Sequence, residues 1–258
     1  MATLHSVPLE YMTMYRLIYV VSAIFLTLFS NTACADEFYK TTNDVITHFY
    51  QKGDDKDAPW HKNNSGDTGV SDYSLCYNKQ ISQQPQQYLI VMCSDMGKST
   101  YANEQATADL YILKQTTQGF SLLASKPDIE GQFQDVVNIG SDKWAIHTST
   151  HSMNQGYEQS HDTLHVFIKD EFIPIASWTS LQNNEGAVDP DNAEVQDNAE
   201  SIANKLTIDN TQKDTDFYPL IIHSVGYRGK TKINETYRII YTMDKGEYSV
   251  PYELNGGY

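Results

Sequence analysis

Much of the chain consists of short runs rich in aliphatic, aromatic and β-branched residues, separated by polar or turn-forming residues, which is the pattern of β-strands. The segments with this pattern are Leu110–Leu113, Phe120–Ala124, Val136–Ile139, Trp144–Thr150, Leu164–Lys169, Phe172–Trp178, Tyr218–Gly226, Thr236–Met243 and Tyr248–Val250. Short polar connections between them are typical of hairpins, and the hairpins recur at uneven spacing, which does not support a regular propeller or solenoid. The pattern predicts a mainly β fold, an antiparallel meander of hairpins that forms a sandwich or a partly open barrel.

One segment has the helical period instead. Its apolar stripe consists of Val45, Ile46, Phe49 and Tyr50. Thr42 or Asn43 provides an N-cap and Gly53 ends the pattern. The sequence therefore predicts one amphipathic helix, Thr42–Lys52, ahead of the strands.

The first 35 residues have the three parts of an export signal. Arg16 supplies a basic region, Leu17–Phe29 is almost entirely apolar, and small residues end at Ala35. The apolar run is about 13 residues, shorter than the ~20 that a helix needs to cross a membrane. We therefore expect a signal peptide over residues 1–35, cleaved after Ala35, rather than a permanent membrane span.

Two alternatives concern the ends of this signal. Residues 1–13 are polar and precede a second methionine, Met14, so they are read as an artefactual extension. Lipoprotein processing at Cys34 is the weaker alternative, because Asn31 stands where that processing favours an aliphatic residue. Residues 36–258 remain as a single β-rich domain, long enough to bury a core.

Two cysteines follow the export signal, Cys76 and Cys93. They lie in two further predicted strands, Tyr73–Tyr77 and Tyr88–Cys93, which a glutamine-rich loop with Pro85 connects. In an oxidising compartment two such cysteines are expected to pair. We predict a disulfide that links neighbouring strands, in preference to a nucleophilic thiol.

The chain is acidic, with a formal net charge of −15. Removal of the signal leaves this charge unchanged, because it takes away Arg16 and Glu10. Such a charge disfavours nucleic acid and anionic membrane surfaces and permits a basic partner, an unknown protein or peptide. It is also a common means of keeping an exported protein soluble.

Residues 182–216 interrupt the strand pattern. They are acidic and rich in amide side chains, and they contain almost no aromatic residues. This composition predicts an acidic mobile loop, with a short helix near Glu200–Lys205 as the alternative.

Four histidines flank a predicted turn: His147, His151, His161 and His165. If the two strands pair symmetrically about Gly156, His147 lies opposite His165 and His151 opposite His161. All four imidazoles would then share one face. The two pairs would lie about 13 Å apart, so each could supply at most half of a zinc or copper shell, and Asp162, Glu158 or another strand would have to supply the remainder. A polar strand face without metal is the simpler alternative.

No catalytic signature is present in the sequence: it contains no Gly-x-Ser-x-Gly, His-Glu-x-x-His or phosphate-binding glycine loop. The layout resembles that of uncharacterised exported proteins of Gram-negative bacteria. The resemblance spans roughly Asp36–Trp178, through the cysteine-bearing strand and the hairpins at Asp109-Leu-Tyr-Ile-Leu and Gln155-Gly-Tyr, and it contains no diagnostic motif. It implies a periplasmic location and no known activity.

The sequence thus predicts an exported periplasmic β-protein that binds a partner and carries out no covalent chemistry. One alternative is an inhibitor or immunity-type protein that binds a basic enzyme. Another is a metal-binding protein or a hydrolase that uses the histidine face.

Overall fold

The computed structural model describes residues 37–55, 57–63, 72–94, 105–189, 191 and 197–257. The described residues all lie in one compact unit, Glu37–Tyr258. The predicted signal peptide, including Cys34 and Ala35, lies outside the described residues. Within the part that is described, no helix is long and apolar enough to cross a membrane.

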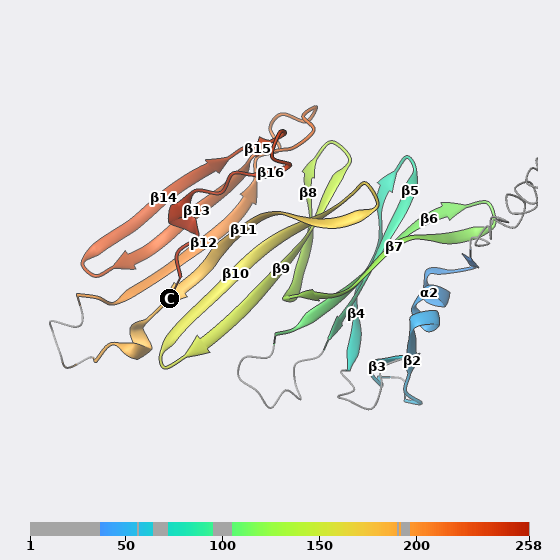
Figure 1. Cartoon of the computed structure of the whole chain (residues 1–258), viewed down its shortest axis with the longest axis horizontal. Coiled ribbons are helices and arrows are strands. Elements are labelled where there is room, and N and C mark those ends of the chain that lie inside the picture. The colour runs from blue at the N-terminus through green and yellow to red at the C-terminus, as the bar shows by residue number, and fades with distance from the viewer. Residues whose placement is uncertain are drawn as a thin grey trace, which may run out of the picture. The chain divides into compact units, whose positions relative to one another are not determined.

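The fold is mainly β, as predicted, and consists largely of two seven-stranded antiparallel sheets (Figure 1). Sheet A has the order β1-β7-β6-β5-β4-β3-β2. Its strands are β1 (Phe38–Tyr39), β2 (Tyr50–Lys52), β3 (Trp60–Lys62), β4 (Tyr73–Gln83), β5 (Gln86–Ser94), β6 (Thr107–Thr116) and β7 (Gly119–Glu130).

Sheet B is a meander in which every strand pairs with its neighbours in the sequence, from β8 to β14. Its strands are β8 (Gln132–Gly140), β9 (Lys143–Asn154), β10 (Tyr157–Ile168), β11 (Glu171–Asn183), β12 (Glu200–Ile208), β13 (Leu220–Arg228) and β14 (Thr231–Ile239). A small hairpin, β15 (Tyr241–Thr242) and β16 (Glu247–Tyr248), and two 3₁₀ turns, Glu185–Ala187 and Tyr252–Leu254, complete the described elements.

The predicted helix is present as α2 (Thr42–Phe49), with different ends. Its N-cap is Thr41, not Thr42 or Asn43: Thr41 Oγ1 accepts from the Asp44 amide, and the Asp44 carboxylate accepts from the Thr41 amide, a capping box. The helix ends at Phe49 rather than Lys52, because Tyr50 is extended and begins β2.

Three apolar clusters hold the described elements together. The first packs α2 on sheet A through Val45, Ile46, Tyr50, Ile90, Met92 and Tyr111. The second joins the two sheets and includes Leu89, Leu110 and Ile112 of sheet A with Val136, Ile146 and Phe172 of sheet B. The third lies on sheet B and includes Leu164, Val166, Trp178, Leu220, Ile222 and the C-terminal residues Tyr248 and Leu254. The two sheets are therefore packed against each other by shared apolar burial.

The chain passes from sheet A to sheet B over one residue, Gly131, between β7 and β8. Its φ of +104° is in the region that favours glycine, and an added Cβ would lie 3.1 Å from the backbone of Ser149. The two sheets are thus joined by a single residue whose conformation is restricted.

The loop predicted over residues 182–216 contains a strand. β12 pairs with β13 from Glu200 to Ile208 and with β11 from Ser201 to Ala203, and Glu200, Ile202 and Asn204 are buried. The mobile loop and the alternative helix near Glu200–Lys205 are therefore wrong for this part. Pairing on both edges of the strand outweighs its polar composition.

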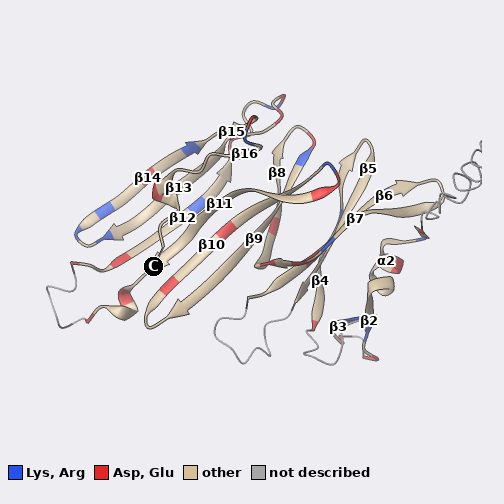
Figure 2. Cartoon of the chain, viewed as in Figure 1, with Lys and Arg blue, Asp and Glu red and all other residues tan. Residues whose placement is uncertain are grey.

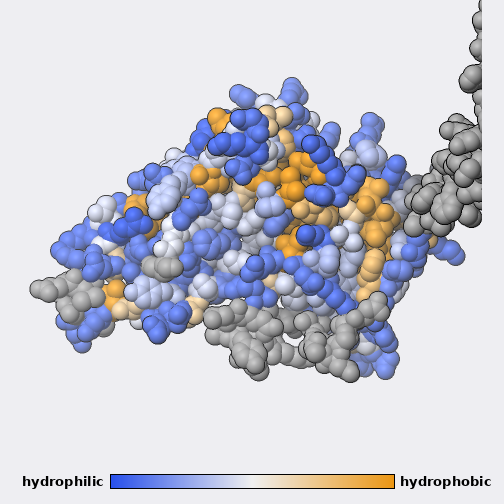
Figure 3. Space-filling view, in the orientation of Figure 1, coloured by the Kyte–Doolittle hydropathy of each residue, from blue (hydrophilic) through white to orange (hydrophobic). Residues whose placement is uncertain are grey.

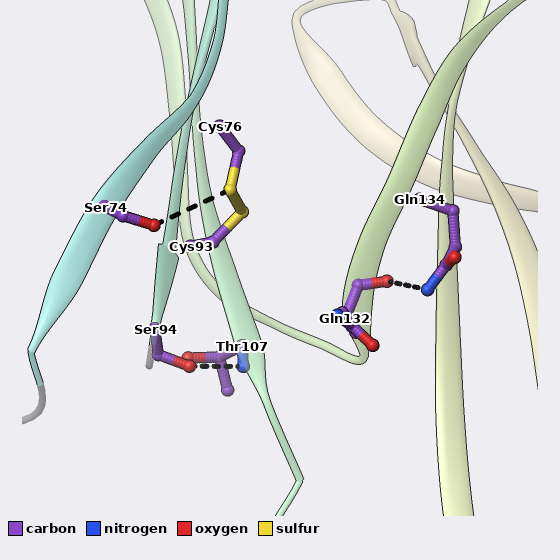
Figure 4. Close-up of a disulfide and its surroundings, with 7 residues drawn as sticks. All are labelled: Ser74, Cys76, Cys93, Ser94, Thr107, Gln132 and Gln134. Carbon is purple, nitrogen blue, oxygen red and sulfur yellow. Dashed lines mark hydrogen bonds between the residues drawn. A yellow bond between two sulfur atoms is a disulfide. The ribbon is translucent and has the colours of Figure 1, made fainter. Parts of the chain in front are cut away.

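The predicted disulfide between Cys76 and Cys93 is confirmed (Figure 4). It links the adjacent strands β4 and β5, and Cys76 stands at an irregularity in their pairing between Leu75 and Tyr77. The glutamine-rich loop is much shorter than predicted, because the strands continue to Gln83 and from Gln86.

We expect the Cys76→Ser/Cys93→Ser double variant to unfold more easily than the wild type. The bond closes a segment with a sequence separation of 17 residues, and a loop of this size contributes about 3 kcal/mol in the chain-entropy model. Urea denaturation of both proteins under non-reducing conditions measures the difference. Equal midpoints would contradict a stabilising role for the bond.

Candidate functional site

The histidine hairpin has a different register from the predicted one. A two-residue turn, Gln155-Gly156, joins β9 and β10, and both residues have positive φ, 51° and 83°. This is the backbone of a tight hairpin turn whose twist matches the strands. Consequently His147 lies opposite Leu164 and His165 opposite Ile146. The symmetric pairing about Gly156 is wrong by one residue.

A shift of one residue moves one strand's side chains to the other face of the sheet. His147 and His151 therefore lie on one face, and His161 and His165 on the other. The four-histidine face that suggested zinc or copper is not formed. Over the described ranges, no group of three or more His, Cys, Asp or Glu side chains is arranged to hold a metal ion.

His147 instead pairs with a partly buried carboxylate, that of Asp162. Its Nε2 lies 2.8 Å from Asp162 Oδ2, and its ring stacks on Trp178 with centroids 5.6 Å apart. The hydroxyls of Ser149 and Ser180 both donate to Asp162 Oδ1, at 2.7 and 2.6 Å. Burial alone would raise the pKa of Asp162, but the hydrogen bonds from His147, Ser180 and Ser149 outweigh burial and lower it.

The other three histidines have separate surroundings. His151 is exposed, and its Nδ1 lies 3.0 Å from Ser160 Oγ. Burial lowers the pKa of His161, against an opposing effect of Asp162. Burial, with a smaller contribution from the charge of Lys126 on sheet A, lowers the pKa of His165 to about 4. His165 is thus neutral at physiological pH.

A pocket of about 510 Å³ lies at the His147–Asp162 pair. It draws residues from five consecutive strands of sheet B: Asp135, Val137, His147, Asp162, Ser180 and Ala203–Ile208. The pairing of β11 with β12 ends at Leu181 and Ala203, and β12 continues beyond it to Ile208. We call this site the polar pocket.

Asn204 gives the polar pocket an unusual buried group. The residue is only 8% exposed, and its Nδ2 donates to the Thr179 carbonyl at 2.7 Å. Its Oδ1 has no hydrogen-bond partner among the described residues, and the same holds for Trp178 Nε1 beneath the His147 ring. Buried polar atoms are nearly always paired, so such an atom at a pocket is a candidate ligand contact.

A larger hollow of about 700 Å³ lies where hairpin ends of both sheets meet, and we call it the apolar groove. Its apolar and aromatic lining consists of Ile81, Trp144, Val166, Phe167, Ile168, Ile173, Phe217, Tyr241 and Met243. Charged residues also line it: Asp142, Lys143, Lys169, Glu171 and Asp216. Figure 3 shows hydrophobic surface gathered over the region of β8 and the β10–β11 hairpin, bordered by hydrophilic residues.

One wall of the groove is an aromatic stack. The rings of Phe217 and Tyr241 are nearly parallel, with centroids 3.6 Å apart. Lys143 Nζ lies 5.3 Å from the Phe217 ring and 3.5 Å from the Asp216 carboxylate. These contacts hold a flat apolar surface in place at the edge of the groove.

Comparisons with protein families, with curated proteins and with solved structures find no match. The function of this chain must therefore be argued from its own geometry.

Sequence reasoning missed both hollows. The residues of the apolar groove come from separate hairpins, and no spacing in the sequence brings Ile81 near Trp144 or Phe217. The aromatic residues at the ends of the hairpins were a partial signal of a binding surface. From the sequence alone, the same residues could equally have been assigned to core packing. Asp162 was considered only as a metal ligand, whereas in the structure it binds His147 and two serines.

Proposed function

We propose that this protein is an exported binding module whose site is the apolar groove, and that its partner is a basic protein or peptide that inserts apolar side chains. The observation that carries the proposal is the groove itself. Its volume of about 700 Å³ lies within the range of about 300–1,000 Å³ that is usual for ligand sites, and its lining is mostly apolar and aromatic.

The chemistry of the lining favours binding over catalysis. The described residues that line the groove include no histidine and no cysteine, the residues that most often serve as a general base or as a thiol nucleophile. Its aromatic residues offer large, rigid contact area, which is typical of binding surfaces.

The charge of the chain favours a basic partner. The net charge is −15, and acidic residues occur on both sheets (Figure 2). At the groove, Asp142, Glu171 and Asp216 outnumber Lys143 and Lys169. Complementary charge steers association and disfavours acidic competitors.

Selection from a random peptide library displayed on phage tests the proposal, with the protein expressed from the full coding sequence and immobilised. We expect enriched peptides to combine aromatic or aliphatic residues with Lys or Arg. Met243 lines the groove and is 71% exposed. The Met243→Ser variant should bind an enriched peptide about tenfold more weakly, because the peptide loses apolar contact there.

Met153→Ser is the matched control. Met153 is 56% exposed and lies in β9, outside the lining of the groove. Its substitution should leave the affinity unchanged. Enrichment of acidic peptides, or an equal loss of affinity in both variants, would contradict the proposal.

A further inference from the structure

The side of β12 that faces β11 is open over half of the strand. β12 pairs with β13 along its whole length, but with β11 only at residues 201–203. Residues 204–208 have no strand on this side in the part of the chain that the structure describes. An interior strand of sheet B therefore ends in a free edge, and a free edge is a template for a further strand.

The alternation of the strand determines which backbone groups point into this opening. The Asp209 amide donates to the Pro219 carbonyl at 2.9 Å, so every second residue of β12, counted back from there, turns its N–H and C=O toward β13. The residues between them turn theirs toward the opening: Asn204, Leu206 and Ile208. Outside the strand pairings, the described residues supply a backbone partner for only one of these groups, the Ile208 carbonyl, which accepts from the Asn210 amide at 3.2 Å.

The contacts of Asn204 show that β11 and β12 separate at this point. In a paired strand the backbone amide would reach the neighbouring carbonyl directly. Here the side chain of Asn204 spans the distance, and its Nδ2 donates to the Thr179 carbonyl at 2.7 Å. The C-terminal residues lie beside β11, where the Gly256 carbonyl accepts from the Thr179 hydroxyl, but over residues 247–257 they make no backbone hydrogen bond to β12.

The polar pocket lies along this free edge. Its lining includes the consecutive residues 203–208 of β12. A hollow over one face of a strand would touch alternate residues, so contact with consecutive ones places the pocket at the edge. Side chains from the other strands form the facing wall: Asp135, Val137, His147, Asp162 and Ser180. This wall leaves space for one extended segment, whereas the edge of a second folded sheet would bring its own neighbouring strand into the wall.

We propose that the polar pocket binds an extended peptide segment of another protein, which pairs with residues 204–208 of β12 as an added strand. A polypeptide backbone carries N–H and C=O groups at the repeat of a strand, so the free groups of Asn204 and Leu206 match this class of ligand. Peptide side chains opposite Leu206 and Ile208 would lie on the same face as these two residues, which pack on the third apolar cluster. Aliphatic residues are favoured there.

Amide hydrogen exchange of the protein expressed from the full coding sequence tests whether the edge is free. We expect the Leu206 amide to exchange at least tenfold faster than the Thr207 amide, because Thr207 faces β13 and Leu206 faces the opening. Equally slow exchange of both amides would mean that this chain or a second copy already occupies the edge, and it would overturn the proposal.

Titration with the neutral peptide Ac-Val-Thr-Val-Thr-Thr-NH₂, followed by ¹H–¹⁵N NMR, tests binding. In an antiparallel pairing its valines lie opposite Ile208 and Leu206. We expect millimolar affinity, saturable shifts of the backbone amides of residues 204–208, and exchange of the Leu206 amide that is at least tenfold slower at saturation. Absence of saturable shifts at these residues would contradict the proposal.

Two N-methylated analogues distinguish an added strand from other modes of binding. Only alternate amides of a strand face its neighbour. The analogue that is methylated at its first, third and fifth residues loses the amides that face β12 and should bind at least tenfold more weakly than the parent peptide. The analogue that is methylated at its second and fourth residues should bind like the parent. Equal affinities of the two analogues would exclude strand addition.

The Leu206→Pro variant removes an amide that faces the opening and should weaken binding of the parent peptide at least tenfold. Asn234→Pro is the matched control. Asn234 is exposed in β14, the last strand of sheet B, and its amide faces away from β13 because a two-residue turn joins Arg228 to Thr231. This control should leave the affinity unchanged, and equal losses in the two variants would refute the site.

The N-methylated analogues decide the question even if Leu206→Pro does not fold. The polar pocket shares no lining residue with the apolar groove. None of these results therefore depends on whether the apolar groove binds a peptide.

Discussion

The Asp109→Ala variant should lose about 3–5 kcal/mol of unfolding free energy, because it removes a fully buried carboxylate that accepts hydrogen bonds from three groups. Asp109 is fully buried in β6. Its carboxylate accepts from the Tyr50 hydroxyl, from the Asp128 amide at 2.8 Å and from Lys62 Nζ at 2.9 Å. Without it, the Tyr50 hydroxyl and the Lys62 ammonium lose their shared acceptor inside sheet A.

Urea denaturation with the wild type in parallel measures this loss. Asp128→Asn is the control, because Asp128 is an exposed partner of the same lysine, at 2.7 Å, and asparagine tolerates its positive φ of 56°. We expect the control to cost less than about 1 kcal/mol. Similar losses in the two variants would show that the buried position of Asp109 has no special effect.

The second large expected effect is a loss of stability at acidic pH that His165 causes. This loss should be absent from a His165→Gln variant. Burial lowers the pKa of His165 from 6.5 to about 4. Between these two values the unfolded chain binds a proton at this residue and the folded chain does not. Stability contributed by the neutral ring is therefore fully present above pH 6.5 and is lost progressively as the pH falls toward 4.

The lost stability is on the order of 3 kcal/mol, from the size of the pKa shift. Unfolding free energies at a series of pH values, for wild type and variant, measure the difference. Glutamine can still hydrogen-bond to Thr148, whose hydroxyl lies 3.3 Å from His165 Nε2. His223→Gln, at an exposed position next to Thr236, is the control. Parallel pH profiles of wild type and His165→Gln would rule out this role for His165.

The strand content of this fold could be predicted because short runs rich in aliphatic, aromatic and β-branched residues lie between turn-forming residues. Such runs become strands that are buried on one face or, as in β5 and β6, on both. Register could not be predicted in the same way. It depends on whether the turn has two or three residues, and Gln155 is an uncommon residue at a position with positive φ. Because the predicted register was wrong by one residue, all four histidines were expected on one face of the sheet. In the structure each face has two of them.

β12 could not be predicted from the sequence for a different reason. Ile202, Leu206 and Ile208 do alternate, but Asn204 occupies the second of the four positions in this series, and the acidic residues before the strand dominate the composition. Asp109 illustrates the same difficulty, because an aspartate at the start of an apolar run ordinarily marks an exposed strand end. Its burial is made favourable by the Asp128 amide and by two partners more than forty positions earlier in the sequence, Tyr50 and Lys62.

The single-residue connection at Gly131 also has a consequence for how the protein is made. All strands of sheet A precede it and all strands of sheet B follow it. A chain that emerges from its N-terminus can therefore pair every strand of sheet A before β8 has appeared. Sheet B can be completed only later, because residues near the end of the sequence pack on it. Tyr248 and Leu254 belong to its apolar cluster, and the Gly256 carbonyl accepts hydrogen bonds from Gln159 and Thr179. Residues 248–256 thus complete the fold, and a chain that stops short of them leaves the third apolar cluster open to water.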